Sequence, residues 1–219
     1  MKSQKEPNIF HIAASYTIGT YILPGESIEY LREQTKSKMK LKINSCTDII
    51  KGVKDGIFDL GFIESPIFDD NLTYREWEGD ELIVCSKSKL PLLLNKELLS
   101  EYNLISREES SPTRILIDDF LSIFNISSKN FKSLSEINNT TAIIQSVKWS
   151  KPNLINPTVA IVSNLAIEYE IKYKELFEAR IYNKPIKRKF YIVTSKQNDN
   201  NPLILNIVQG LLKEKQKAS

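Results

Sequence analysis

Residues 41–65 read LKINSCTDIIKGVKDGIFDLGFIES, in which a short helical pattern separates two strand-like runs. The alternating run at 41–44 predicts a strand, and the polar residues at 46–48 can start a helix by meeting its free N–H groups. Apolar residues then recur at helical spacing through 49–57, where a glycine can end the helix. Because an apolar strand follows at 60–63, this stretch predicts a βαβ unit and a parallel sheet.

The same pattern occurs just before it. Residues 9–14 predict a strand, and Ser15, Tyr16 and Thr17 lead into a helix predicted over 18–34. Each strand is thus followed by a hydroxyl or thiol side chain at the start of a helix. In open α/β sheets, ligands bind at the carboxyl ends of the strands, where helix N-termini offer unpaired N–H groups.

The rest of the chain repeats this alternation in a second set, which predicts two α/β lobes. We expect the first lobe to comprise residues 1–69 and 196–219 and the second to comprise 70–195, with the polar loop after Pro66 as the first crossing. Two further features are predicted within the second lobe. Two short strands, at 72–77 and 81–86, are separated by Glu78-Gly79-Asp80, and a helix begins at Ser135-Glu136.

The composition is that of an ordinary soluble globular protein, with 41% hydrophobic and 26% charged residues in 219. A net charge of +3 with mixed signs predicts no basic face for DNA binding by this chain. No stretch has the pattern of a secretory signal or a membrane span. The two cysteines, Cys46 and Cys85, are far apart, which favours a reducing cytoplasm. With one histidine and two cysteines, we expect no transition metal and no cofactor.

Four segments carry a family resemblance: ASYTIGTYILP at 14–24, DGIFDLGFIES at 55–65, ELIVCSKSKLP at 81–91 and KRKFYIVTSK at 187–196. In order and spacing they resemble the effector-binding domain of LysR-type transcriptional regulators, over about residues 9–212. The resemblance implies a two-lobed α/β fold of the type 2 periplasmic-binding-protein kind. In that fold each lobe is a mixed, mostly parallel sheet flanked by helices.

The candidate ligand site is the cleft between the lobes, lined by residues at the ends of strands. In the resembled family, effectors are mostly small organic anions held there by hydroxyl and N–H groups. The family's ligand-binding positions match this chain best at the residues after the first two strands. They match less well at Ser163, because residues 150–157, SKPNLINP, are inserted before its strand. The candidates are Ser15, Tyr16, Thr17, Cys46, Thr47, Glu64 and Ser65 from the first lobe and Ser106, Arg107, Thr113, Arg114, Ser163 and Asn164 from the second.

Each candidate also has a structural interpretation. The serines and threonines can be simple helix caps, and Cys46 can be either a ligand residue or a redox sensor. Arg107 and Arg114 suit a carboxylate, but a surface ion pair with Glu108 or Glu109 is an equal alternative. The basic run at 184–189 is expected to be a solvated strand entrance, and His11 a structural histidine.

We therefore predict a sensor of a small polar or anionic metabolite that is no enzyme and forms a homodimer, or a tetramer in the intact regulator. A winged helix-turn-helix normally precedes this domain in the family, so we expect an excised domain with residues 1–7 as linker; a free-standing sensor is the alternative.

Two other classes of function stay open. One is the solute-binding protein of a transporter. The other is an enzyme resembling prephenate dehydratase, whose T-R-F element Thr113-Arg114-Ile115 partly matches.

Overall fold

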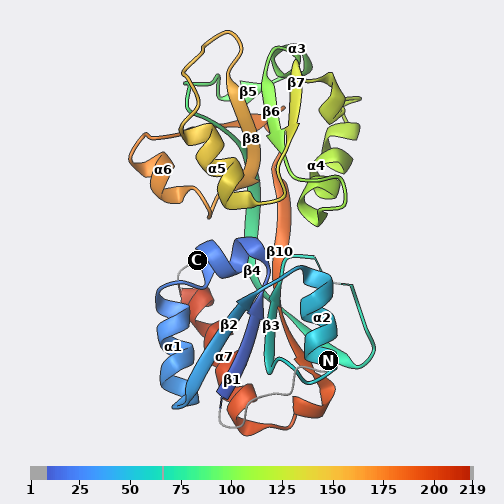
Figure 1. Ribbon diagram of the computed structural model, residues 1–219, viewed down its shortest axis with the longest axis vertical. Helices are drawn as coiled ribbons and strands as arrows, with labels where there is room; N and C mark the ends of the chain where they lie inside the picture. Colours follow the sequence, from blue (N-terminus) through green and yellow to red (C-terminus); the bar gives the residue numbers. More distant parts are fainter. Residues whose placement is uncertain (1–8, 66, 218–219) are drawn as a thin grey trace. The chain divides into compact units, whose positions relative to one another are not determined.

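The computed structural model describes residues 9–65 and 67–217, which form two compact units (Figure 1). Unit 1 comprises the described residues up to Gly79 and those from Lys189 onward, and unit 2 comprises Asp80–Arg188. The chain therefore passes between the units twice, after Gly79 and after Arg188. The expected linker at residues 1–7, and Pro66, lie outside the described residues.

Unit 1 is a mostly parallel sheet with helices on both faces. Its elements are β1 (Ile9–Ala14), the π-helical η1 (Ile18–Ile22), α1 (Glu26–Thr35), β2 (Lys38–Ile43), α2 (Cys46–Lys54), β3 (Leu60–Ile63), the 3-10 helix η3 (Lys196–Asn198) and α7 (Pro202–Lys217), with parts of β4 (Leu72–Ser86) and β10 (Ile186–Ser195). β1 lies between β2 and β3 and pairs in parallel with both, and β10 pairs antiparallel with β3. In Figure 1, α2 lies on one side of these strands and α1 and α7 on the other.

The predicted βαβ unit is confirmed in β2, α2 and β3. The helix ends at Lys54, and Gly56, two residues later, has a φ of +70°, the left-handed conformation that glycine favours. Its N-cap is Ser45, whose Oγ accepts the N–H of Asp48 (3.2 Å). By contrast, the helix predicted over 18–34 is interrupted between η1 and α1, where Gly25 has a φ of +97°.

Unit 2 is a second mostly parallel sheet with helices on both faces. Its elements are β5 (Leu93–Leu94), α3 (Lys96–Ser100), β6 (Asn103–Ser106), α4 (Pro112–Ser122), the 3-10 helix η2 (Ser128–Asn130), β7 (Ser133–Glu136), α5 (Thr140–Lys148), β8 (Thr158–Ser163), α6 (Glu168–Lys172) and β9 (Phe177–Ile181), with parts of β4 and β10. β6 pairs in parallel with β7 and β8, whereas β4 pairs antiparallel with β8 and β9. Figure 1 shows α4 and α5 on opposite sides of β6 and β8.

Two element predictions in this region are wrong. The helix predicted to begin at Ser135 begins at Thr140, because Ser135 and Glu136 pair with β6 as the end of β7 and Asn139 caps the helix by accepting the N–H of Ala142 (2.8 Å). The two strands predicted on either side of Gly79 are one continuous strand, β4. Gly79 therefore makes no turn.

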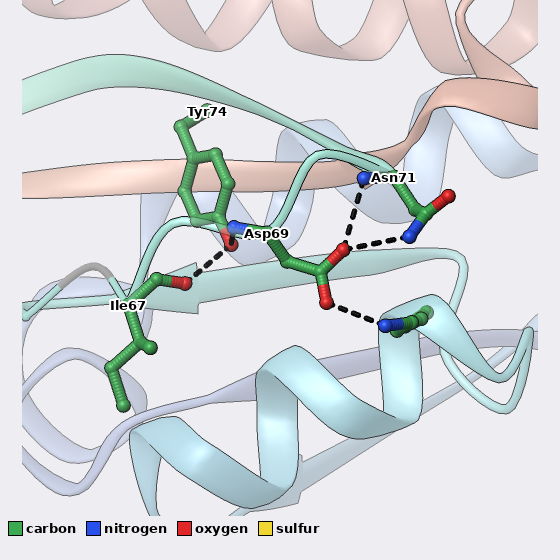
Figure 2. Close-up of polar contacts among 5 residues, drawn as sticks. Ile67, Asp69, Asn71 and Tyr74 are labelled. Atoms are coloured by element: carbon green, nitrogen blue, oxygen red, sulfur yellow. Dashed lines mark hydrogen bonds and ion pairs between the residues drawn. The ribbon is translucent and has the colours of Figure 1, made fainter.

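The passages between the units also lie elsewhere than we placed them. Residues 70–79 and 189–195, expected in the second lobe, cluster with unit 1. The loop expected as the first crossing stays in unit 1, where the Asp69 carboxylate (Figure 2) accepts a hydrogen bond from Lys54 Nζ at the end of α2 (2.6 Å).

Candidate functional site

The carboxyl ends of β2, β1 and β3 meet at one edge of unit 1, because the three strands are parallel. Ser15 follows β1 directly, Cys46 opens α2 soon after β2, and Glu64 follows β3. The seven candidates that we predicted from the first lobe therefore lie on the segments that leave this edge.

Ser15 has the chemical property expected of a ligand-binding residue. Its backbone N–H donates to the Phe62 carbonyl (2.9 Å), and its carbonyl accepts the N–H of Gly19 (2.8 Å). The side chain is 1% exposed, and its Oγ has no hydrogen-bond partner within residues 9–65 and 67–217. An unpaired buried hydroxyl costs free energy, so such groups call for an explanation, and a ligand that is bound there is one.

The helical turn after Ser15 is unusual. Tyr16 is exposed and Thr17 is buried, and both lead into η1, where the Leu23 N–H donates to the Ile18 carbonyl (2.9 Å) in a π-helical pattern. Gly19 lets this turn approach β2, since a Cβ there would lie 2.9 Å from Ile43 Cγ1. π-helical turns occur frequently at functional sites.

At the start of α2, the two candidates differ in environment. Ser45 is the capping residue, so capping does not account for Cys46 or Thr47. Thr47 is exposed, whereas Cys46 is buried as a member of an apolar cluster that includes Ile49 and Val53. Such surroundings favour an inert thiol over a redox sensor.

Unit 2 repeats the arrangement. β6, β7 and β8 are parallel, and β6 and β8 end at Ser106 and Ser163, both buried. Ser111 is the N-cap residue of α4, but its side chain makes no capping hydrogen bond. The Ser111 Oγ is buried and has no partner in the described part of the chain.

Both arginine candidates are held by groups of their own unit. Arg107 donates from Nε and Nη2 to the Glu108 carboxylate (both 2.8 Å), and this hydrogen bonding lowers the pKa of Glu108. Arg114 donates to Asp118 (2.7 Å), to the Arg107 carbonyl (3.0 Å) and to Ser128 Oγ (2.9 Å). The ion-pair alternative is therefore confirmed for Arg107 with Glu108.

Sequence reasoning missed a buried ion pair between Asp80 and Arg188. Arg188 Nε lies 2.6 Å from Asp80 Oδ2, and the two side chains are 6% and 0% exposed. Ser163 Oγ donates to Asp80 Oδ1 (2.9 Å), and Arg188 Nη1 donates to Thr113 Oγ1 (3.1 Å). Two of the candidate residues, Ser163 and Thr113, are thus bound to this pair.

The prediction that Arg188 belongs to a solvated basic run is wrong. A signal for its burial was available in the alternation of the strand, because Ile186 and Phe190, which share its face, are both buried. The same alternation places Asp80 on the inward face of β4 together with Leu82.

A hollow of about 390 Å³ lies elsewhere on unit 2, and it includes none of the predicted site residues. It is lined by Ile83, Leu92, Leu93, Glu178, Ala179, Arg180 and Asn183. The residues that the structure describes include no group of three or more His, Cys, Asp or Glu arranged to hold a metal ion. None of the helices in that part of the chain is both long and apolar enough to cross a bilayer.

Relatives of this chain are transcriptional regulators. It is 27% identical over 194 residues to the probable RuBisCO transcriptional regulator of Phaeodactylum tricornutum, covering 85% of this chain and 61% of that protein. It is 30% identical over 148 residues to the uncharacterized HTH-type transcriptional regulator YeiE of Escherichia coli K12, covering 66% of this chain and 50% of that protein. The chain thus spans between half and about three-fifths of the length of these curated relatives.

Solved structures show the same fold. The CcmR regulatory domain of Synechocystis PCC6803, in complex with 2-PG, matches with a TM-score of 0.76 at 19% identity, covering 95% of this chain and 97% of that one. The effector-binding domain of QuiR with shikimate matches with a TM-score of 0.71 at 17% identity, covering 98% and 99%. The family model of the LysR substrate binding domain matches residues 3–216. The chain therefore belongs to the LysR substrate-binding domain family, and its predicted fold class is confirmed.

Proposed function

We propose that this chain is the ligand-sensing domain of a LysR-type transcriptional regulator, and that it binds a small polar or anionic metabolite without chemical turnover. The observation that supports this most is the buried Ser15 hydroxyl at the end of β1, which has no partner among the described residues. The small organic molecules in the CcmR and QuiR structures, 2-PG and shikimate, support the same class of ligand.

The ligand is held by hydroxyl and N–H groups rather than by a guanidinium. Arg107, Arg114 and Arg188 are each paired with a carboxylate of unit 2, so none of them brings an uncompensated positive charge to the strand ends. Hydroxyls such as those of Ser15 and Thr47, and the N–H groups at helix starts, can bind either a polar or an anionic ligand.

In the intact regulator the domain acts in the cytoplasm as a homodimer that assembles into tetramers, and DNA is bound by a helix-turn-helix outside this domain. The relatives that are transcriptional regulators, and are longer than this chain, support this assignment. Exposed edge strands in each unit, β2 and β7, offer unpaired backbone groups for a second copy.

A thermal-shift screen tests the proposal, with 2-PG and shikimate among its small polar and anionic compounds. A ligand at about 100 times its Kd stabilises the folded state by about 2.7 kcal/mol, which raises Tm by several degrees. We expect the ligand to cause no rise in Tm for Ser15→Ala and Thr47→Val, whereas without ligand both variants should have the Tm of the parent. Ser122→Ala, which alters a hydroxyl bonded to Asp119 in α4, is the control and should keep the rise. A full rise in both site variants would contradict the proposal.

A further inference from the structure

The loop of residues 150–157, which connects α5 to β8 in unit 2, displays two adjacent apolar side chains to solvent (Figure 1). Leu154 and Ile155 are 78% and 76% exposed. Single exposed apolar residues are common on protein surfaces, whereas exposed apolar residues that lie together are typical of an interaction site. We call residues 150–157 the apolar loop.

Hydrogen bonds hold the apolar loop in one conformation. Asn153 Oδ1 accepts the N–H groups of Ile155 and Asn156 (both 2.9 Å). The Asn156 side chain donates to the Glu101 carbonyl (3.0 Å), which ties the loop to the end of α3. Because the loop is ordered in advance, a partner that covers its apolar side chains has little backbone freedom to remove.

The hollow described above on unit 2 lies near the apolar loop. The Asn153 N–H donates to Ser88 Oγ (2.8 Å), and Ser88 is four residues before Leu92, which lines the hollow. Four residues span at most about 14 Å, so the loop and the hollow are neighbours on the same unit. Leu92 and Leu93 are themselves 79% and 54% exposed.

The hollow is suited to aliphatic side chains. Its volume is about 390 Å³, and it is lined by the buried Ile83 and Ala179 together with the exposed Leu92 and Leu93. Pockets of this size that are lined mainly by apolar side chains bind apolar groups. The apolar loop of a second copy of this chain presents such groups.

The charges at the two places are opposite in sign. Lys151 is an exposed residue of the apolar loop, and Glu178 lines the hollow. Neither forms an ion pair or a side-chain hydrogen bond with another residue that the structure describes. Arg180, which also lines the hollow, donates two hydrogen bonds to the Glu81 carboxylate (2.7 and 3.0 Å). The guanidinium is therefore already compensated, and Glu178 is left to pair with a cation.

We propose that the apolar loop of one copy docks into the hollow of a second copy, with Leu154 and Ile155 inside it. Lys151 then lies beside Glu178 of the other copy. Because the loop and the hollow are neighbours on one unit, a twofold axis between them lets each copy fill the hollow of the other, and the interface closes as a pair.

This contact uses neither β2 nor β7 and needs no ligand, so it is separate from the proposed edge-strand homodimer and from ligand sensing. It buries only a few side chains from each copy. Interfaces at the small end of the range are weak, so we expect the association at high protein concentration.

Sedimentation equilibrium of the unliganded domain over a wide range of concentrations tests the contact. Leu154→Asp should weaken the association seen at the highest concentrations by about tenfold or more, because it brings a second carboxylate to Glu178 in an apolar hollow. Leu203→Asp, which alters an exposed apolar residue at the start of α7, is the control and should associate like the parent. A parent that does not associate at these concentrations, or an unchanged association of Leu154→Asp, would overturn the proposal.

Reversal of the charges tests the pairing itself. Lys151→Glu and Glu178→Lys should each weaken the association, because each places like charges together across the interface. The two substitutions combined in one chain make the charges opposite again and should restore the parental association. A combined variant that associates no better than either single variant would exclude the pairing of Lys151 with Glu178.

A disulfide between copies locates the contact. Isotope-labelled domain carrying Lys151→Cys is mixed with unlabelled domain carrying Glu178→Cys, and mixed pairs are identified by mass after oxidation; both native cysteines are buried. The yield should exceed that of a matched mixture in which Lys51→Cys, at an exposed position on α2, replaces Lys151→Cys. Equal yields would overturn the proposed interface. No ligand is added, so these outcomes leave the proposed function intact, and a failed thermal-shift screen would not alter them.

Discussion

At the scale of single residues, Asp69 shows how one carboxylate holds a loop (Figure 2). Its side chain accepts hydrogen bonds from Lys54 Nζ (2.6 Å) and from the backbone and side-chain N–H groups of Asn71 (both 2.9 Å). Its own N–H donates to the Tyr74 hydroxyl (3.2 Å), which donates to the Ile67 carbonyl (2.7 Å). These donors, Lys54 first, lower the pKa of Asp69 to about 2.

We expect an NMR titration of the Asp69 carboxyl to show a midpoint near 2 instead of the ordinary 3.8. Because the folded-state pKa is the lower one, the contribution of Asp69 to stability is complete above the unfolded value and is lost as the pH falls through about 2. Lys54→Met should raise the midpoint, and Lys51→Met, one turn or less earlier on α2, should not. A midpoint near 3.8 in the unmodified domain would show that these bonds do not form.

For single residues, the sequence predicts positions at strand ends well but does not predict partners that are distant in the chain. Ser15, Cys46 and Ser106 could be placed at strand ends because strand and helix patterns are local. The pairing of Asp80 with Arg188 joins residues 108 positions apart, and no local pattern identifies such a partner. The alternation of each strand indicates only that the two charges face inward.

At the scale of elements, the close packing of α2 on β3 depends on the absence of a side chain at Gly61. A Cβ there would lie 2.7 Å from Ile49 Cγ2 and 3.0 Å from Val53 Cγ2, and both side chains are fully buried. The βαβ unit was predictable from the spacing of those apolar residues. The interruption at Gly25 also had a local signal, because the pair Pro24-Gly25 is typical of a turn, but the helix prediction over 18–34 passed over it.

Gly61→Ala should therefore destabilise the domain by about 1–3 kcal/mol, the usual cost of overpacking a core. Chemical denaturation measures this as a lower midpoint. The matched control is Gly79→Ala, also in a strand, whose Cβ meets nothing within 4 Å. Equal midpoints for the two variants would mean that α2 can move away from β3 without cost.

At the scale of the whole molecule, the edge strands β2 and β7 are the surfaces on which the proposed homodimer can be tested. All four residues of β7 are exposed, and Leu134 presents an apolar side chain there. The lysines of β2, at 38, 40 and 42, are a common means of preventing indiscriminate pairing at an edge.

For the proposed homodimer, we expect Leu134→Glu to shift sedimentation toward the monomer, because a buried charge without a partner opposes association. Ile123→Glu, which alters an exposed apolar residue at the end of α4, should sediment like the parent. A dimer that withstands Leu134→Glu would exclude β7 from the interface.

The two-unit division could be anticipated from the two sets of alternating strands and helices, but its boundaries could not. Composition changes little along β4, so we predicted the first passage at the polar loop after Pro66 instead. The contacts place them inside β4 and β10, at Gly79 and Arg188.

The uneven division of the chain has a consequence for its synthesis. Unit 2 is one uninterrupted segment, Asp80–Arg188, whereas unit 1 needs β10 beside β3 and α7 beside α1, and both come from the later part of the chain. Because domains generally fold as units while the ribosome is still adding residues, the middle of this polypeptide can reach its final form first. Unit 1, which begins with β1, must wait until β10 and α7 have been translated before it is complete.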